Sequence, residues 1–122
     1  MCGISGISEE NVRLVEEMVS VTSHRGPDDR GIFSEPGITL GHSRLSIQDL
    51  SYAGHQPMKS STGRYTIVFN GEIYNFKKLR ASISSNYKFT SGTDTEVILE
   101  LLERHGLDCL NKISGIYAFG IW

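Results

Sequence analysis

Cys2 is the residue whose position most directly suggests chemistry, because removal of Met1 leaves it with both a thiol and a free α-amine. An unperturbed thiol titrates at about pH 8.5 and an unperturbed α-amine at about pH 8, so a proton passes readily between such groups. A residue of this kind carries a nucleophile and a general base together, as amino-terminal nucleophiles do in covalent catalysis. A small buried cysteine is the alternative interpretation, and the position of Cys2 by itself does not outweigh it.

The dipeptide Asn70-Gly71 follows a segment of alternating apolar and polar residues. This dipeptide is the strongest short signal for a type I′ hairpin turn, and taken alone it favours the turn. An asparagine amide and a glycine N–H are also suitable donors for the oxyanion that forms when a thiolate attacks a carboxamide. The two interpretations are compatible, so we expect a hairpin that also presents an oxyanion site.

Two charged residues are candidates for binding the charged groups of an amino acid. Arg44 lies in a segment that includes the apolar residues Leu45 and Ile47, where a guanidinium can hold a carboxylate through two parallel hydrogen bonds, although a solvated surface arginine is the simpler expectation. Asp94 lies at the predicted start of a helix, where unpaired N–H groups stabilise a carboxylate. It is equally suited to an ammonium group.

The remaining residues of metal-binding or nucleophilic type are assigned no chemistry. None of the histidines has a spacing typical of a metal site; they are His24, His42, His55 and His105. Cys109 lies in an apolar segment, where an inert buried thiol is expected. The sequence therefore predicts no metal centre.

Length and composition limit the classes of protein to which the chain can belong. The 122 residues fit one domain and include no run of about 18 apolar residues that would cross a membrane. Twelve basic and fourteen acidic side chains give a formal charge of -2 without a basic stripe, so nucleic acid is not an expected partner. Two cysteines and no secretory signal predict a cytoplasmic protein without a disulfide framework.

Strands and helices must alternate to position these residues. Period-two patterns and turn signals predict strands over 3–7, 31–33, 38–42, 45–47, 64–69 and 72–74. A first helix is expected after Ser8 as N-cap, burying Val12, Val15, Val19 and Thr22 on one face. Further helices are predicted over 76–84 and 94–105, the last with Thr93 and Glu96 as a capping box and Gly106 at its end.

The chain ends in an apolar run over 116–122 that predicts a strand with no polar residue after it. Such a strand looks cut from a longer chain, so we expect a domain shortened at its C-terminal end. The sheet edge left open is a hypothetical site for pairing with a second copy of the chain.

Six segments taken together resemble the class II glutamine amidotransferase domain, in the form found in glutamine-hydrolysing asparagine synthetases. They are Met1-Cys2-Gly3-Ile4 and the segments 24–28, 41–47, 54–58, 69–75 and 93–96. The resemblance covers residues 1–122 as one domain. It implies an α+β fold, a four-layer αββα sandwich of the N-terminal nucleophile type with two antiparallel sheets.

Carried over residue by residue, the resemblance implies that Cys2 is the nucleophile and that Asn70 and the Gly71 N–H form the oxyanion hole. Arg44 would hold the α-carboxylate of L-glutamine, and Asp94 and Glu72 would orient its α-ammonium. The same pocket would be lined by Leu45, Ser46, Ile47 and Gln48, with residues 25–28 shaping its wall.

The resemblance also implies partners beyond this chain. Ammonia released through a Cys2 thioester would pass to a C-terminal synthetase domain, absent here, that uses ATP and magnesium to amidate aspartate. No cofactor is expected within residues 1–122. A chain that retains Met1 is expected to be inactive, because the Cys2 nitrogen is then an amide. The alternatives are an asparagine-synthetase-like paralogue with a different ammonia acceptor and a non-catalytic glutamine-binding module.

Overall fold

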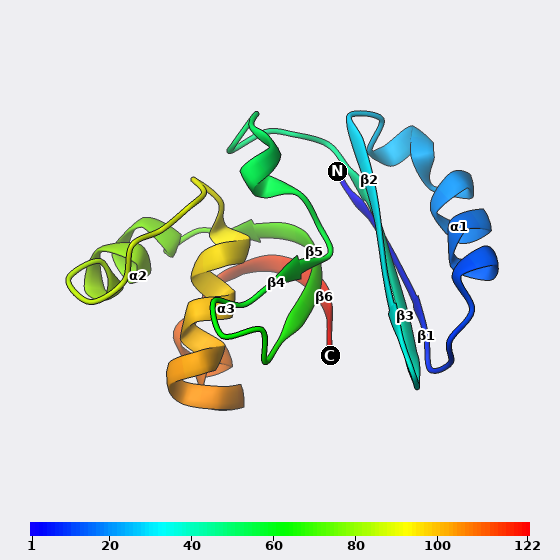
Figure 1. Ribbon diagram of the computed structural model, residues 1–122. Helices are drawn as coiled ribbons and strands as arrows, with labels where there is room; N and C mark the ends of the chain where they lie inside the picture. Colours follow the sequence, from blue (N-terminus) through cyan, green and yellow to red (C-terminus); the bar gives the residue numbers. More distant parts are fainter.

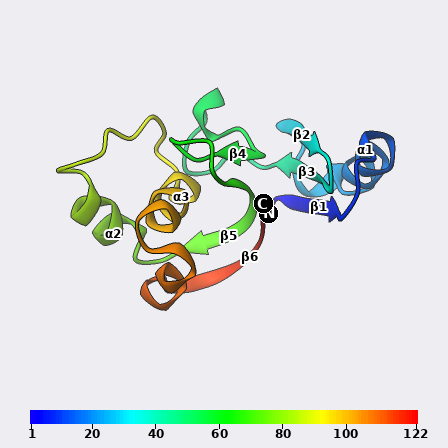
Figure 2. The same ribbon diagram turned by 60° about the horizontal axis from the view of Figure 1, so that its bottom comes forward.

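The computed structural model describes residues 1–122, the whole sequence, and shows four layers in the order αββα (Figure 1). Helix α1 (Val12–Val21) covers a first sheet, a second sheet lies behind it, and helices α2 (Phe76–Ile83) and α3 (Asp94–His105) cover the far side. Figure 2 shows the same separation, with α1 and α3 on opposite sides of the two sheets. The predicted α+β sandwich with two antiparallel sheets is confirmed.

The first sheet contains β1 (Gly3–Ile7), β2 (Asp29–Glu35) and β3 (Ile38–Arg44), in the order β1-β3-β2 with antiparallel pairing throughout. Its outer face lies against α1, and Gly41 of β3 permits close packing there. A Cβ on Gly41 would lie 2.5 Å from a methyl carbon of Val19 and 2.6 Å from one of Val15. Because side chains alternate along a strand, His42 and Arg44 face the second sheet instead.

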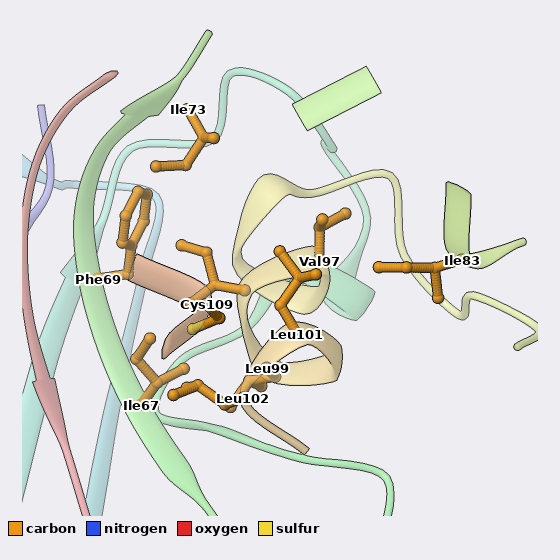
Figure 3. Close-up of a cluster of buried hydrophobic side chains, with 10 residues drawn as sticks. Ile67, Phe69, Ile73, Ile83, Val97, Leu99, Leu101, Leu102 and Cys109 are labelled. Carbon is orange, nitrogen blue, oxygen red and sulfur yellow. The ribbon is translucent and has the colours of Figure 1, made fainter. Parts of the chain in front are cut away.

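The second sheet contains β4 (Met58–Lys59), β5 (Thr66–Ile73) and β6 (Gly115–Ile121), in the order β4-β5-β6. Alternate residues of β5 pack against α3 in the main apolar core (Figure 3). That core comprises Ile67, Phe69, Ile73, Ile83, Val97, Ile98, Leu99, Leu101, Leu102 and Cys109. Cys109 is fully buried there, as predicted. Three short 3-10 segments complete the fold: η1 (Ser23–Arg25), η2 (Tyr52–Gly54) and η3 (Gly106–Lys112).

The predicted hairpin at Asn70-Gly71 is wrong, because β5 continues through both residues to Ile73. The partner of this segment is β6, which comes from more than 40 positions later in the sequence and pairs Asn70 with Ala118 and Gly71 with Tyr117. Glycine is needed at position 71 for close approach: a Cβ there would lie 2.6 Å from Tyr117 Cα and closer still to Ile116 O. The returning strand predicted over 72–74 is therefore the end of β5.

The strand predicted over 45–47 is also absent, since β3 ends at Arg44. The next two backbone N–H groups donate to side chains instead of to a neighbouring strand. Leu45 N–H points to Cys2 Sγ at 3.4 Å, and Ser46 N–H donates to Asp28 Oδ2 at 2.7 Å. The chain therefore leaves the sheet at the point where the candidate residues gather.

The first helix begins later than predicted. Asn11, not Ser8, is its N-cap, and the Asn11 side chain accepts from Leu14 N–H at 3.1 Å. Asn11 N–H donates in turn to Thr39 Oγ1 of β3 at 2.9 Å, a contact between distant segments that fixes where the helix starts. Val15 and Val19 are buried as predicted, whereas Val12 in the first turn is 42% exposed.

Helix α3 has the predicted limits, with Thr93 Oγ1 accepting from Glu96 N–H and Gly106 at its end with φ +55°. The second half of the capping box does not form. The Glu96 carboxylate accepts from the backbone N–H groups of Thr90 at 2.8 Å and Ser91 at 2.7 Å. Burial opposes the charge, but these and other hydrogen bonds from Ser91 and Thr90 lower the pKa of Glu96. The loop before α3 is thereby fixed.

None of the helices is both long and apolar enough to cross a membrane.

Candidate active site

A cavity of about 330 Å³ lies where the two sheets meet the loop after β3 and the start of α3. Nine of the ten predicted site residues line it: Cys2, Arg44, Leu45, Ile47, Gln48, Asn70, Gly71, Glu72 and Asp94. These residues come from segments that are far apart in the sequence. The cavity is thus built by the tertiary structure from the residues that the sequence marked as chemically significant.

Cys2, which precedes β1, is held between two elements. Its Sγ lies 3.4 Å from Leu45 N and 3.7 Å from Leu45 O, in the loop after β3. On the backbone side, Arg25 Nε donates to Cys2 O at 3.1 Å. The thiol is partly exposed to the cavity and unpaired with any other cysteine. It is therefore fixed in place and accessible to a ligand.

The edge of β5 that faces away from β6 presents the Gly71 N–H to the cavity. Thr66 and Trp122 exchange two backbone hydrogen bonds, and Tyr74 N–H donates to Ser114 O, so even-numbered residues of β5 pair with β6. Backbone N–H direction alternates along a strand, so odd-numbered residues direct their N–H groups to the opposite edge. Strand β4 covers only the first two residues of that edge and does not reach Gly71.

The N–H groups on either side of Gly71 along this edge are occupied by side chains. Phe69 N–H donates to Gln56 Oε1 at 2.6 Å, and Ile73 N–H donates to Asp94 Oδ2 at 3.0 Å. Between them, the Gly71 N–H faces the cavity, and the side-chain amide of Asn70 makes no hydrogen bond within the protein. Two donors are therefore free for a negatively charged oxygen in the cavity.

Arg44 is buried, with 6% of its surface exposed, and is not the solvated surface arginine favoured by the sequence alone. Its Nη1 donates to Ser51 O at 2.8 Å, and its Nη2 donates to Asp49 O. The guanidinium packs against Gly54, where any side chain would collide with it. A guanidinium has five N–H groups, so donors remain for a carboxylate in the cavity.

Asp94 at the start of α3 is joined to Gln48 of the loop after β3. Gln48 Nε2 donates to Asp94 Oδ2 at 3.4 Å, and Asp94 N–H donates to Gln48 Oε1 at 3.1 Å. Burial raises the pKa of Asp94, which means that its charge is only partly compensated by hydrogen bonds from the protein. A cationic group in the cavity would therefore stabilise the ionised carboxylate.

Asp49 connects the loop after β3 to the loop before α3. Its Oδ2 accepts from Gly92 N–H at 2.7 Å, and its Oδ1 accepts from Ser51 N–H at 2.8 Å. The hydrogen bond from Gly92, supported by those from Ser51, lowers the pKa of Asp49 to about 2. This carboxylate stays charged over the working pH range and fixes the backbone carbonyls that hold Arg44.

Ser46 is the one predicted site residue that does not line the cavity. Its N–H is bonded to Asp28, so this residue joins the loop after β3 to the segment before β2. The prediction that residues 25–28 form the pocket wall is likewise wrong, since none of them lines the cavity. They lie behind it, and Gly26 packs directly on the backbone of Ser43 and Arg44. Glu72 lines the cavity from an exposed position.

Gln56 and His42 are buried near the cavity and have no role predicted from the sequence. Gln56 lines the cavity. Its segment, 54–58, is one of the motifs on which the family resemblance rests, but the sequence assigned it no function. His42 donates from Nε2 to Phe69 O at 3.1 Å, and burial lowers the pKa of His42 to about 4, so its imidazole is neutral. Local sequence gives no signal for either residue, because their hydrogen-bond partners, Phe69 of β5 and Thr95 of α3, are distant in the sequence.

The structure contains no group of three or more His, Cys, Asp or Glu side chains suited to a metal ion.

Comparison with known proteins agrees with this geometry. A family model described as a glutamine amidotransferase domain matches residues 1–122. Asparagine synthetase B [glutamine-hydrolyzing] of Escherichia coli is 38% identical over 128 residues, which include 100% of this chain and 23% of that protein. Amidase chry2 of Gibberella zeae is 34% identical over 121 residues, covering 98% of this chain and 18% of that protein.

A solved structure, glutamine phosphoribosylpyrophosphate amidotransferase from B. subtilis, has a TM-score of 0.83 and 20% identity, covering 100% of this chain and 35% of that one. At this identity the similarity concerns the fold. The chain spans less than a quarter of the length of each of these two relatives. The match over the whole chain shows that it belongs to the class II glutamine amidotransferase domain family, in the form found with glutamine-hydrolysing asparagine synthetases.

Proposed function

We propose that this chain, once Met1 is removed, hydrolyses L-glutamine to glutamate and ammonia as the glutaminase part of a longer asparagine synthetase. The observation that carries the proposal is the cavity, which Cys2 shares with two free oxyanion donors, Asn70 and Gly71, and with one charged partner for each charged group of an α-amino acid, Arg44 and Asp94. A cavity of this composition fits a zwitterion whose side chain ends in a carboxamide.

The proposed reaction begins with transfer of the Cys2 thiol proton to the α-amine of the same residue. The thiolate attacks the carboxamide carbon of glutamine, and the carbonyl oxygen becomes an oxyanion bound by the Asn70 amide and the Gly71 N–H. Collapse of this intermediate breaks the C–N bond, and the ammonium of Cys2 returns the proton to the departing ammonia. Water then hydrolyses the thioester and releases glutamate and the free thiol.

Substrate orientation follows from the two charged groups. Arg44 holds the α-carboxylate, while Asp94, with the exposed Glu72, attracts the α-ammonium. Because burial raises the pKa of Asp94, an ammonium beside it relieves an uncompensated charge and favours the ionised form. Gln48, bonded to Asp94, completes this side of the pocket.

The test uses the full-length protein, with mass spectrometry to establish that Met1 has been removed. Cys2→Ala is expected to abolish release of glutamate from glutamine. Cys109→Ala is the matched control, since Cys109 is buried in the apolar core away from the cavity, and it should retain turnover. Continued glutamate release by the Cys2 variant would contradict the proposal.

The acceptor of the ammonia is proposed to be aspartate, activated by ATP in the remainder of the protein, as the name of the E. coli relative suggests. A second candidate is an asparagine-synthetase-like enzyme with another acceptor, which is favoured by the similarity to a relative named amidase. Full-length protein given glutamine, aspartate and ATP should form asparagine. Glutamate release without asparagine formation would favour the second candidate.

A further inference from the structure

Phe69, the residue before the proposed oxyanion donors, has both of its backbone polar groups held by side chains. Its N–H donates to Gln56 Oε1 at 2.6 Å, and its C=O accepts from His42 Nε2 at 3.1 Å. These two groups point away from β6, at the edge that β4 does not cover. The side chains thus replace the strand that would otherwise fix the backbone at this position.

Gln56 is well placed to set this geometry. It is buried, with 6% of its surface exposed, and its Nε2 donates to Thr95 Oγ1 of α3 at 3.3 Å. The backbone of Gln56 packs directly on Gly31 of β2, where a Cβ would collide with the Gln56 carbonyl. One side chain therefore joins the edge of β5 to α3, while its backbone lies against the first sheet.

We propose that Gln56 is a positioning residue that fixes the direction of the Gly71 N–H by holding the Phe69 N–H two residues earlier on the same edge of β5. This inference rests on the proposed glutaminase function. The Phe69 and Gly71 N–H groups point the same way only while this stretch of β5 keeps its extended form. Without the Gln56 acceptor, the buried Phe69 N–H is left unsatisfied, and the strand twists to recover a partner.

The consequence for catalysis is confined to the step that forms the oxyanion. An oxyanion exists after attack by Cys2 and not in bound glutamine, so a misdirected donor lowers kcat and leaves KM nearly unchanged. Loss of an oxyanion donor costs about 10²–10³ in kcat. A displaced donor retains part of that effect, so we expect a loss of about 10-fold to 100-fold.

The test uses full-length protein from which Met1 has been removed. Gln56→Met removes the acceptor at nearly constant volume. Ser60→Ala is the matched control: Ser60 is also buried and accepts from a backbone N–H, that of Tyr65 at 3.0 Å, immediately before the start of the same strand. Gln56→Met should lower kcat by about 10-fold to 100-fold with KM within about threefold, whereas Ser60→Ala should leave both near wild type.

A second readout separates positioning from a general loss of stability. The aldehyde analogue of glutamine forms a tetrahedral adduct with a thiol, whereas glutamate occupies the pocket without one. Gln56→Met should weaken binding of the aldehyde by about the same factor as the fall in kcat and leave glutamate binding unchanged. Gln56→Glu, which keeps an acceptor oxygen for Phe69, should retain kcat within about threefold.

The possible results separate the role proposed for Gln56 from the proposed glutaminase activity. Wild-type protein that releases no glutamate would overturn both. An active wild type together with a Gln56→Met variant that resembles Ser60→Ala, or that changes KM alone, would overturn the inference and leave the function standing. If Gln56→Met does not fold, Gln56→Glu decides: a folded variant with a tenfold or larger loss in kcat overturns the role assigned to the acceptor oxygen.

Discussion

Replacing Arg44 with lysine tests whether this residue binds the α-carboxylate of glutamine. The guanidinium donates one N–H to Ser51 O and another to Asp49 O, and Arg44 lines the cavity with its other N–H groups unused within the protein. An ammonium has three N–H groups, so a lysine that satisfies both carbonyls keeps one for the ligand. Losing one hydrogen bond to a charged group costs about 1.5–3 kcal/mol, which corresponds to a roughly 10-fold to 150-fold weaker interaction with glutamine.

The assay is glutamate release by full-length, Met1-processed protein over a range of glutamine concentrations. Arg44→Lys should raise KM by about 10-fold to 150-fold and change kcat by less than about threefold, because the carboxylate is bound before and during the reaction alike. The control is Arg13→Lys, since the Arg13 side chain is 90% exposed and lies on the outside of α1. This control should leave both constants unchanged.

A second substrate, 4-aminobutanamide, which lacks the α-carboxylate, allows the two enzymes and the two substrates to be compared in a thermodynamic cycle. The ratio of kcat/KM between wild type and Arg44→Lys should fall to near one with this substrate, because it has no carboxylate for the arginine to bind. An equal fall in kcat/KM with glutamine and with 4-aminobutanamide would refute the reasoning. It would show that Arg44 shapes the loop after β3 without binding the ligand.

Three further variants test the site. Burial raises the pKa of Asp94, so the folded state binds the carboxyl proton more tightly than the unfolded chain does, and this stabilisation is lost as pH rises. Asp94→Asn should therefore raise the thermal midpoint at neutral pH. The same variant should raise KM for glutamine by about 10-fold to 100-fold. The hydrogen bond from Gly92 lowers the pKa of Asp49 to about 2, so the ionised Asp49 carboxylate stabilises the fold until pH falls toward that value. Asp49→Asn should raise KM for glutamine about threefold to tenfold in steady-state assays. Gly71→Ala places a methyl group against Ile116 O, so kcat should fall by about 10²–10³-fold, and an unchanged kcat would contradict the oxyanion assignment.

Elements whose signals are local were predicted closely from the sequence. Helix α3 begins after Thr93 and ends before Gly106 as expected, because capping depends on residues three or four positions apart. Strand β1 and the alternating part of β5 were also found from their own residues. Nine of the ten predicted site residues line one cavity, and they were found from the motifs that carry the family resemblance.

Elements that depend on distant partners were not predicted. Asn70-Gly71 has the composition of a turn, but pairing with β6 keeps it extended, and no nearby residue reveals that partner. A solvated surface position is the simpler expectation for an arginine such as Arg44, but the loop after β3 folds back and places two carbonyls on its guanidinium. For Asn70-Gly71 the deciding partner is distant in the sequence, whereas the two carbonyls that hold Arg44 lie only five and seven residues later and reach it because the loop folds back.

Cys2 also combines a property that the sequence determines with one that only the tertiary structure decides. Its type and its place beside Met1 determine by themselves that a thiol and an α-amine can act together after processing, since both belong to one residue. Only the tertiary structure decides that Cys2 and the free N–H on the open edge of β5 line one cavity, because that edge exists through the pairing of β5 with β6 and the early end of β4. The nucleophile is a property of the sequence, whereas the oxyanion site is a property of the assembled sheets.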